Sequence, residues 1–136
     1  MDRQAVQSWL DHYVEGWETY DPQVIGDLFS EDATYRYHPY DEGDDVLRGR
    51  NAIVESWTAP EGNASSRDAP GTYDAKYEAW AVDGDRAVAV GFSRYWADAS
   101  RSTVARIYDN VFLLRFDADG RCAEFTEVFI QRPDAG

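Results

Sequence analysis

The chain contains very few of the residues that build disulfides and metal centres. Cys122 is its single cysteine, so no disulfide can form within the chain and no cysteine cluster can bind a metal. Its two histidines, His12 and His38, lack the spacing of a zinc or iron site. We therefore expect no bound metal.

Long apolar runs are also absent. No stretch approaches the roughly 20 residues that a membrane-spanning helix needs. The N-terminal sequence MDRQAVQSWLDHY lacks the basic start and the apolar segment of a secretory signal peptide. These absences predict a cytoplasmic protein that has no membrane partner.

Basic side chains are scarce relative to acidic ones. Lysine and arginine together number 13, against 26 aspartates and glutamates, which gives a formal net charge of −13. Nucleic acids and anionic membrane surfaces are bound mainly through lysine and arginine. We therefore expect no nucleic acid partner, and we interpret the excess of acidic side chains as a means of keeping the protein in solution.

Apolar and aromatic residues are what the chain has in quantity. Hydrophobic residues make up 43% of the sequence and aromatic residues 15%, with five tryptophans, nine tyrosines and six phenylalanines. Large rings can line a cavity as well as fill a core. The length of 136 residues suits one domain, so we predict a single domain over residues 1–136.

Three helices are expected in the first half of the chain. Apolar side chains recur at spacings of three and four over residues 6–17, which predicts an amphipathic helix with Tyr13 on its buried face. Asp21 followed by Pro22 is typical of a second helix start, because aspartate caps free amides and proline fits the first turn. Gly49 precedes a third apolar segment with helical spacing.

The remaining segments favour strands. A short strand is expected over residues 33–38, where Pro39 ends it. The second half is rich in aromatic and β-branched residues and is divided by turn-forming sequences. It predicts four long strands, over residues 73–82, 86–96, 103–116 and 122–131. Short turns join these strands, so an antiparallel meander is expected, and the Pro- and Gly-containing segment 59–71 is expected to be a loop.

The third long strand carries apolar groups on both of its faces. Phe112 and Leu114 lie on one face, whereas Ile107, Val111 and Leu113 lie on the other. A sheet with one face in water would instead alternate between apolar and polar residues. We therefore expect one face to cover the core and the other to contact a second copy of the chain, which predicts a homodimer.

Three segments and the order of the elements carry a family resemblance. The segments are LFSEDAT at residues 28–34, RGRNAI at 48–53 and RFDADGR at 115–121. They resemble the helix-to-strand junction, the start of the third helix and the last hairpin of the nuclear-transport-factor-2-like (NTF2-like) superfamily, which includes ketosteroid isomerases and SnoaL-like polyketide cyclases. The resemblance implies an α+β fold, a cone-shaped barrel in which three N-terminal helices pack on a strongly curved, mostly antiparallel sheet around one pocket.

The ketosteroid isomerase pattern can be compared residue by residue. That family uses a tyrosine on the first helix and a neutral aspartic acid as oxyanion donors, and a carboxylate as base. The resemblance places the tyrosine at Tyr13, and it places the base at His38 or at Tyr37, depending on the end of the strand from which one counts. A slip of one residue would turn the side chain to the other face. The second donor position is taken by Phe112, which has no proton to give, so ketosteroid isomerisation itself is not expected.

The same alignment predicts which side chains face the pocket. It places Glu127 between Phe125 and Phe129 on the inner face of the last strand. A carboxylate there must pair with a cation such as Arg106 or Arg94, accept hydrogen bonds, or take a raised pKa. The predicted catalytic residues are Glu127, His38 and Tyr13, and the predicted ligand-binding residues are Trp17, Tyr37, Tyr108, Asn110, Phe112, Phe125 and Phe129.

These features favour hypotheses from two classes. The first is a cofactor-free acid–base enzyme of the isomerase, cyclase or dehydratase type, acting on a small hydrophobic cyclic molecule. Glu127 or His38 would move the proton, and Tyr13, Tyr37 and Asn110 would bind the developing oxyanion. The second is a binding module that holds a hydrophobic ligand or a protein partner without chemistry.

A further alternative within the enzyme class is water activation of the epoxide-hydrolase type. It would need a relay of Arg106 between Asp109 and Glu127. Arg106 and Asp109 are three residues apart and face opposite sides of a regular strand, so the relay requires a bulge between them.

Overall fold

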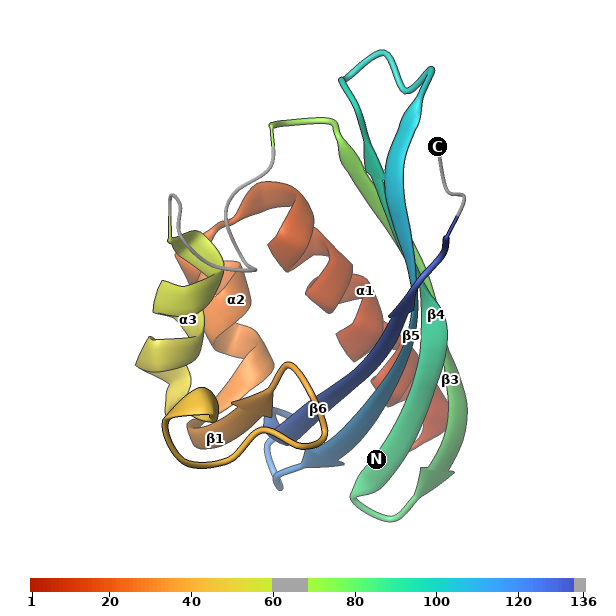
Figure 1. Ribbon diagram of the computed structural model, residues 1–136. Coiled ribbons are helices and arrows are strands. Elements are labelled where there is room, and N and C mark those ends of the chain that lie inside the picture. The colour runs from red at the N-terminus through yellow and green to blue at the C-terminus, as the bar shows by residue number, and fades with distance from the viewer. Residues whose placement is uncertain (60–68, 134–136) are drawn as a thin grey trace.

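The computed structural model of the chain describes residues 1–59 and 69–133. Three helices lie against one side of a curved sheet (Figure 1). The helices are α1 (Arg3–Thr19), α2 (Pro22–Leu28) and α3 (Arg50–Thr58), and the strands are β1 (Phe29–Arg36), β2 (Leu47–Arg48), β3 (Tyr73–Asp83), β4 (Arg86–Trp96), β5 (Val104–Phe116) and β6 (Cys122–Gln131). Most of the loop expected over residues 59–71 lies outside the described residues.

The sheet has the strand order β2-β1-β6-β5-β4-β3. Strands β3 to β6 form the predicted antiparallel meander, and β1 joins it by pairing in parallel with β6. The sheet curves around the helices, but β2 and β3 remain its edges, so it does not close into a barrel (Figure 1). The predicted arrangement of three helices on a strongly curved, mostly antiparallel sheet is confirmed.

Local capping explains where the first two helices begin. The Asp2 side chain accepts a hydrogen bond from the backbone amide of Ala5 at 2.8 Å, which satisfies one free amide of α1. The Asp21 side chain does the same for the amide of Gln23 at 2.9 Å, and proline is the first residue of α2, as predicted. No helix in the described residues is both long and apolar enough to span a membrane.

Strand β1 begins earlier than the sequence indicates. The helical spacing extends the apolar face of the second helix to Phe29, but Phe29 has an extended backbone and pairs with Cys122 of β6. An apolar residue at this position suits either element, and the pairing with β6 decides between them. The strand also ends at Arg36, so Tyr37 and His38 lie in the turn that follows it.

Gly91 allows strands β3 and β4 to curve closely over the core. A Cβ atom at this position would lie 2.1 Å from the carbonyl oxygen of Lys76 and 2.5 Å from the ring of Tyr77. Gly91 pairs with Tyr77 on one side and with Asn110 of β5 on the other. The missing side chain therefore leaves the space in which the Tyr77 ring lies.

The core is built largely of aromatic rings. Its fully buried large side chains include Phe29, Tyr35, Trp57, Phe112, Phe116 and Phe125. Trp9 of α1 joins them, and its indole Nε1 donates a hydrogen bond to the carbonyl oxygen of Leu28 at 2.9 Å. This core fills one end of the space between α1 and the sheet, and the candidate site occupies the other.

Candidate functional site

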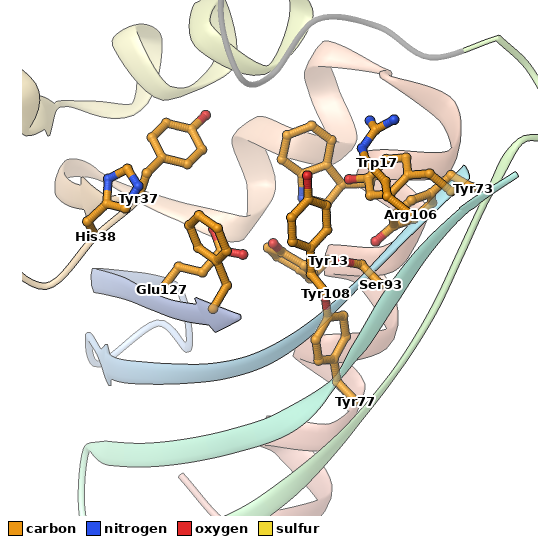
Figure 2. Close-up of a pocket in the computed structure, with 12 residues that line it drawn as sticks. Tyr13, Trp17, Tyr37, His38, Tyr73, Tyr77, Ser93, Arg106, Tyr108 and Glu127 are labelled. Carbon is orange, nitrogen blue, oxygen red and sulfur yellow. The ribbon is translucent and has the colours of Figure 1, made fainter. Parts of the chain in front are cut away.

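A cavity of about 130 Å³ lies between the helices and the concave face of the sheet. Figure 2 shows its lining side chains converging from α1, the turn after β1, and strands β3 to β6. The lining residues are Tyr13, Trp17, Tyr37, His38, Tyr73, Tyr77, Ser93, Tyr95, Arg106, Tyr108, Glu127 and Phe129. Eight of these twelve are Tyr, Trp or Phe, so the wall is mainly aromatic and carries four other polar side chains.

Helix α1 contributes Tyr13 and Trp17, which are four residues apart and therefore lie on one face of the helix. The Tyr13 ring stacks with Phe125 and contacts Trp57 and Phe112, with centroids 5.7, 5.3 and 5.0 Å away. The Trp17 ring stacks on Trp57 at 4.0 Å. These contacts hold both side chains in fixed positions on the cavity wall.

Glu127 is the acidic residue of the cavity wall. Alternation along β6 buries Phe125 completely and leaves Phe129 38% exposed, so Glu127 lies between the core and the rim. Its carboxylate makes no hydrogen bond or ion pair with any residue that the structure describes. Arg94, one of its candidate partners, instead binds Asp74 at 2.9 Å. Burial raises the pKa of the Glu127 carboxyl from 4.5 to about 7.

The tyrosines around Glu127 stay protonated. Burial raises the pKa of Tyr13, Tyr73 and Tyr77 well above the usual tyrosine value, and the nearby Glu127 carboxylate raises it further in all three. Their hydroxyls are therefore hydrogen-bond donors across the physiological pH range. The cavity thus combines one carboxylate that titrates near neutral pH with several neutral O–H groups.

Asn110 lies behind the cavity wall and supports it. The residue is only 3% exposed, and its Nδ2 donates hydrogen bonds to Tyr77 Oη at 2.8 Å and to Ser93 Oγ at 3.1 Å. The sequence predicted Asn110 as a ligand contact, whereas the structure places it one layer deeper. Because both oxygens accept from Asn110, the hydroxyl hydrogens of Tyr77 and Ser93 are left for other acceptors.

Phe112 and Phe125 also lie beneath the cavity. Both are fully buried and neither is among the lining residues, although the sequence predicted them as ligand contacts. Phe112 contacts the rings of Tyr13 and Tyr77, with centroids 5.0 and 4.7 Å away. Strand alternation identified their face correctly, but α1 covers that part of the face and fills it with core.

His38 and Tyr37 both line the cavity, so the predicted choice between them does not arise. They follow the end of β1, where strand alternation no longer applies. Tyr37 Oη lies 3.0 Å from Ser56 Oγ of α3. His38 begins a turn in which Asp41 N donates a hydrogen bond to the His38 carbonyl oxygen at 3.1 Å.

The structure adds cavity residues that the sequence analysis did not select. Tyr73, Tyr77, Ser93 and Tyr95 come from β3 and β4, whose inward faces were not aligned with the family pattern. The regular alternation of these strands could have identified them once the inner face was known. Arg106, expected near the strand end, also lines the cavity, and its guanidinium lies 4.0 Å from the centroid of the Tyr95 ring.

The residues of the epoxide-hydrolase relay are not brought together. Asp109 lies on the outer face of β5 and binds Arg132 at 2.7 and 2.8 Å, whereas Arg106 faces the cavity. The pairing of β4 with β5 runs without a bulge from Arg106 through Asp109. In the described ranges, no three His, Cys, Asp or Glu side chains are arranged to hold a metal ion.

Solved structures share this fold. An NTF2-like protein with a cystatin-like fold from Novosphingobium aromaticivorans is 20% identical, with a TM-score of 0.63, and the alignment covers 93% of this chain and 80% of that one. An NTF2-like protein of unknown function from Mesorhizobium loti is 27% identical, with a TM-score of 0.60 and coverages of 96% and 95%. One from Burkholderia xenovorans is 13% identical, with a TM-score of 0.66 and coverages of 98% and 88%.

Sequence comparison agrees with the fold. No curated protein matches the chain. The model of the SnoaL-like domain family, however, matches residues 10–125. This range includes α2, α3, strands β1 to β5 and the start of β6, and of the residues that line the cavity it leaves out Glu127 and Phe129. The chain belongs to the SnoaL-like domain family of NTF2-like proteins.

Proposed function

We propose that the protein is a small-molecule enzyme that catalyses proton transfer, with Glu127 as the proton-transfer group. The observation that carries this proposal is the Glu127 carboxylate, which lines an aromatic cavity and has no partner among the described residues. A carboxylate removed from water and left unpaired is a stronger base than one in solution. Its pKa of about 7 lets it accept and return a proton near neutral pH.

The proposed reaction begins at a carbon next to a carbonyl group. Glu127 removes a proton from this carbon, and the electron pair of the C–H bond moves to the carbonyl oxygen as an enolate. The hydroxyls of Tyr13 and Tyr77 donate hydrogen bonds to this oxygen, because both stay protonated and face the same cavity. If a C=C bond adjoins this carbon, the protonated Glu127 returns the proton to the far carbon of that bond, the carbonyl re-forms, and the substrate is isomerised. If the next carbon carries a hydroxyl group, the carbonyl re-forms with a new C=C bond while the C–O bond breaks, and Glu127 gives its proton to the departing oxygen, which leaves as water.

The size of the cavity limits the substrate. A cavity of roughly 150 Å³ in another protein accommodates one benzene molecule. The cavity here measures about 130 Å³, so the reacting part of the substrate is the size of a single ring. The aromatic wall favours a hydrophobic ring that carries a carbonyl group, and the proposed proton transfer uses only side chains of this chain.

Hydrogen exchange tests this proposal without knowledge of the natural product. The α-hydrogens of single-ring ketones, such as cyclohexanone and 2-cyclohexenone, are followed in D₂O by NMR with catalytic amounts of protein. Glu127→Gln should lower the exchange rate by roughly 100-fold or more, because it removes the base but keeps the shape. Glu31→Gln, on the exposed side of β1, is the matched control and should leave the rate unchanged. Full exchange activity in Glu127→Gln would exclude Glu127 from the mechanism.

Ligand binding without chemistry is the second candidate function. The eight aromatic side chains of the wall favour it, because they offer a binding surface whether or not a reaction follows. If this candidate is correct, single-ring ketones will bind to the wild-type protein but their α-hydrogens will exchange no faster than in buffer.

A further inference from the structure

The turn after β1 holds a histidine against a carboxylate at the edge of the cavity. His38 lines the cavity, and the Asp41 side chain three residues later is almost fully buried beside it. Asp41 Oδ2 accepts a hydrogen bond from the His38 backbone amide at 3.0 Å, and Asp41 Oδ1 lies 3.2 Å from His38 Nδ1. Each carboxylate oxygen therefore has its own partner on the same residue.

This arrangement determines which ring nitrogen carries the hydrogen. An ionised carboxylate can only accept hydrogen bonds, so Nδ1 must be the donor in its contact with Asp41 Oδ1. In the neutral imidazole the other nitrogen, Nε2, then has no hydrogen and is an acceptor. A carboxylate paired with one nitrogen is a common way of setting the chemistry of the opposite nitrogen.

The orientation of the ring is also fixed. The imidazole stacks on Tyr40 at 4.9 Å with an interplanar angle of 17°, and the Phe129 ring lies 5.4 Å away. Pro39 and the backbone hydrogen bond from Asp41 to the His38 carbonyl hold the turn. The ring therefore cannot turn freely, and Nε2 is on the ring edge that is not occupied by Asp41.

We propose that Asp41 is a positioning residue that fixes His38 in the Nδ1-protonated tautomer, so that His38 Nε2 accepts a hydrogen bond from an O–H or N–H group of the ligand. This inference rests on the proposed function, because it takes the cavity that contains Glu127 as the place where the ligand binds. It adds a requirement to the substrate class, because the single-ring ligand must carry a hydroxyl or N–H donor at the end of the cavity where His38 lies. Asp41 was not selected by the sequence analysis, since nothing in the sequence shows that its two oxygens divide between the backbone and the ring.

The tautomer is measured first in the wild-type chain. Long-range ¹H–¹⁵N NMR correlations at about pH 8, above the usual histidine pKa, distinguish the protonated from the unprotonated ring nitrogen. His12 lies on the exposed side of α1, so His12→Gln leaves a single imidazole and assigns its signals. We expect the hydrogen on Nδ1. A hydrogen on Nε2 would overturn the proposal, and this measurement needs no variant of the turn to fold.

Asp41→Asn should reverse the tautomer. The asparagine oxygen is needed by the His38 backbone amide, so its NH₂ group takes the place of Oδ1 and donates to Nδ1. The ring hydrogen then moves to Nε2. Asp44→Asn, which makes the same charge change in the nearby 3₁₀ helix (Gly43–Asp45), is the control and should keep the wild-type pattern. An unchanged tautomer in folded Asp41→Asn would contradict the positioning role.

The ligand requirement is tested with phenol and anisole, which have similar shapes but differ in the O–H donor. Wild-type protein should bind phenol roughly tenfold more tightly than anisole, and phenol should shift the His38 Nε2 signal. The preference for phenol should disappear in Asp41→Asn, because Nε2 then carries the hydrogen and can donate it to the oxygen of phenol or to that of anisole. Equal binding of the two probes by the wild type would refute the ligand requirement. Neither readout uses turnover, so failure of the proposed proton transfer in the ketone exchange assay would be seen separately.

Discussion

At the scale of the residue, the chemistry of Glu127 depends on what surrounds it. The same carboxyl group in water would be almost fully ionised at neutral pH. Between the core and the rim of the cavity, with no partner among the described residues, it is divided between its two protonation states near pH 7. The ionised form of this group is therefore less stable in the folded protein than in water. Carboxylates in such an environment are typical of functional rather than structural positions.

Glu127 should lower the stability of the protein as the pH rises. Its folded-state pKa of about 7 lies above the ordinary value of 4.5, so the folded state binds the proton more tightly than the unfolded state. The destabilisation is absent below about pH 4.5, grows between the two values and is complete above about pH 7. Urea unfolding of the wild type and of Glu127→Gln measures the two free energies of unfolding, and the advantage of the variant should grow with pH across this window. A difference independent of pH would show that the pKa is not raised.

Removing one tyrosine hydroxyl should slow the reaction without unfolding the protein. Tyr13→Phe deletes a donor to the proposed enolate and keeps the ring that packs on Phe125 and Trp57. Loss of one such donor lowers rates by roughly 10²- to 10³-fold. The ketone exchange assay measures this effect, and Tyr40→Phe, at an exposed ring outside the cavity wall, is the control. A variant with wild-type exchange would assign Tyr13 to packing alone.

At the scale of the element, the pairing of β3 with β4 determines where the tyrosines of the wall lie. Gly91 gives Tyr77 the space to fold over β4, and Asn110 of β5 then holds its hydroxyl at 2.8 Å. Three strands therefore cooperate to place one O–H group on the cavity wall. Strand pairing, and not the local sequence around Tyr77, establishes this arrangement.

Gly91→Ala should destabilise the protein and disturb the cavity together. The added methyl group would meet the Lys76 carbonyl and the Tyr77 ring at distances far below van der Waals contact, so β3 must move away. Overpacking of this kind costs roughly 1–3 kcal/mol. Chemical denaturation measures the loss, and Gly84→Ala in the turn between β3 and β4, where a Cβ meets nothing within 4 Å, separates crowding from backbone strain. Because Gly84 has a positive φ of 61° and Gly91 does not, the loss in Gly84→Ala reports strain without crowding. A Gly91→Ala variant as stable as the wild type would show that crowding at Gly91 is unimportant.

At the scale of the whole molecule, the outer face of the sheet presents apolar side chains to water. Leu113, Val128 and Ile130 lie on the face opposite the helices, with exposed fractions of 46%, 36% and 72%. The pairing of β5 with β6 brings Val111 next to Val128. Val111 therefore extends the apolar area formed by Leu113, Val128 and Ile130. We propose that a second copy of the chain covers this face, in line with the apolar residues that β5 carries on both of its faces.

Sedimentation measures this association. Analytical ultracentrifugation at micromolar concentration should give twice the mass of one chain. Leu113→Glu together with Ile130→Glu should give a monomer, because four charges would then lie in the contact of two copies. Tyr40→Glu, an exposed aromatic position away from this face, should remain dimeric. A wild-type monomer under these conditions would exclude the homodimer.

Much of the fold could be predicted because it follows from local patterns. The cap at Asp21 and the apolar stripe of α1 depend on neighbours within a few residues, and the structure shows both. Strand β2, in contrast, has only two residues and exists through its pairing with Thr34 and Tyr35 of β1. A segment this short carries no periodic pattern, so no sequence signal could have predicted it.

The sequence by itself determined the order of the three helices and the antiparallel meander, because periodicity, caps and turns are local properties. The strong curvature of the sheet and the face of β6 that carries Glu127 were implied by the resemblance to the NTF2-like superfamily. Only the tertiary structure decided how deep each inward residue lies. It placed Phe112, Phe125 and Asn110 behind the wall, and it brought Tyr77, Ser93 and Asp41 to the site. Depth depends on which helix covers which part of the sheet, and that follows from packing between residues far apart in the chain.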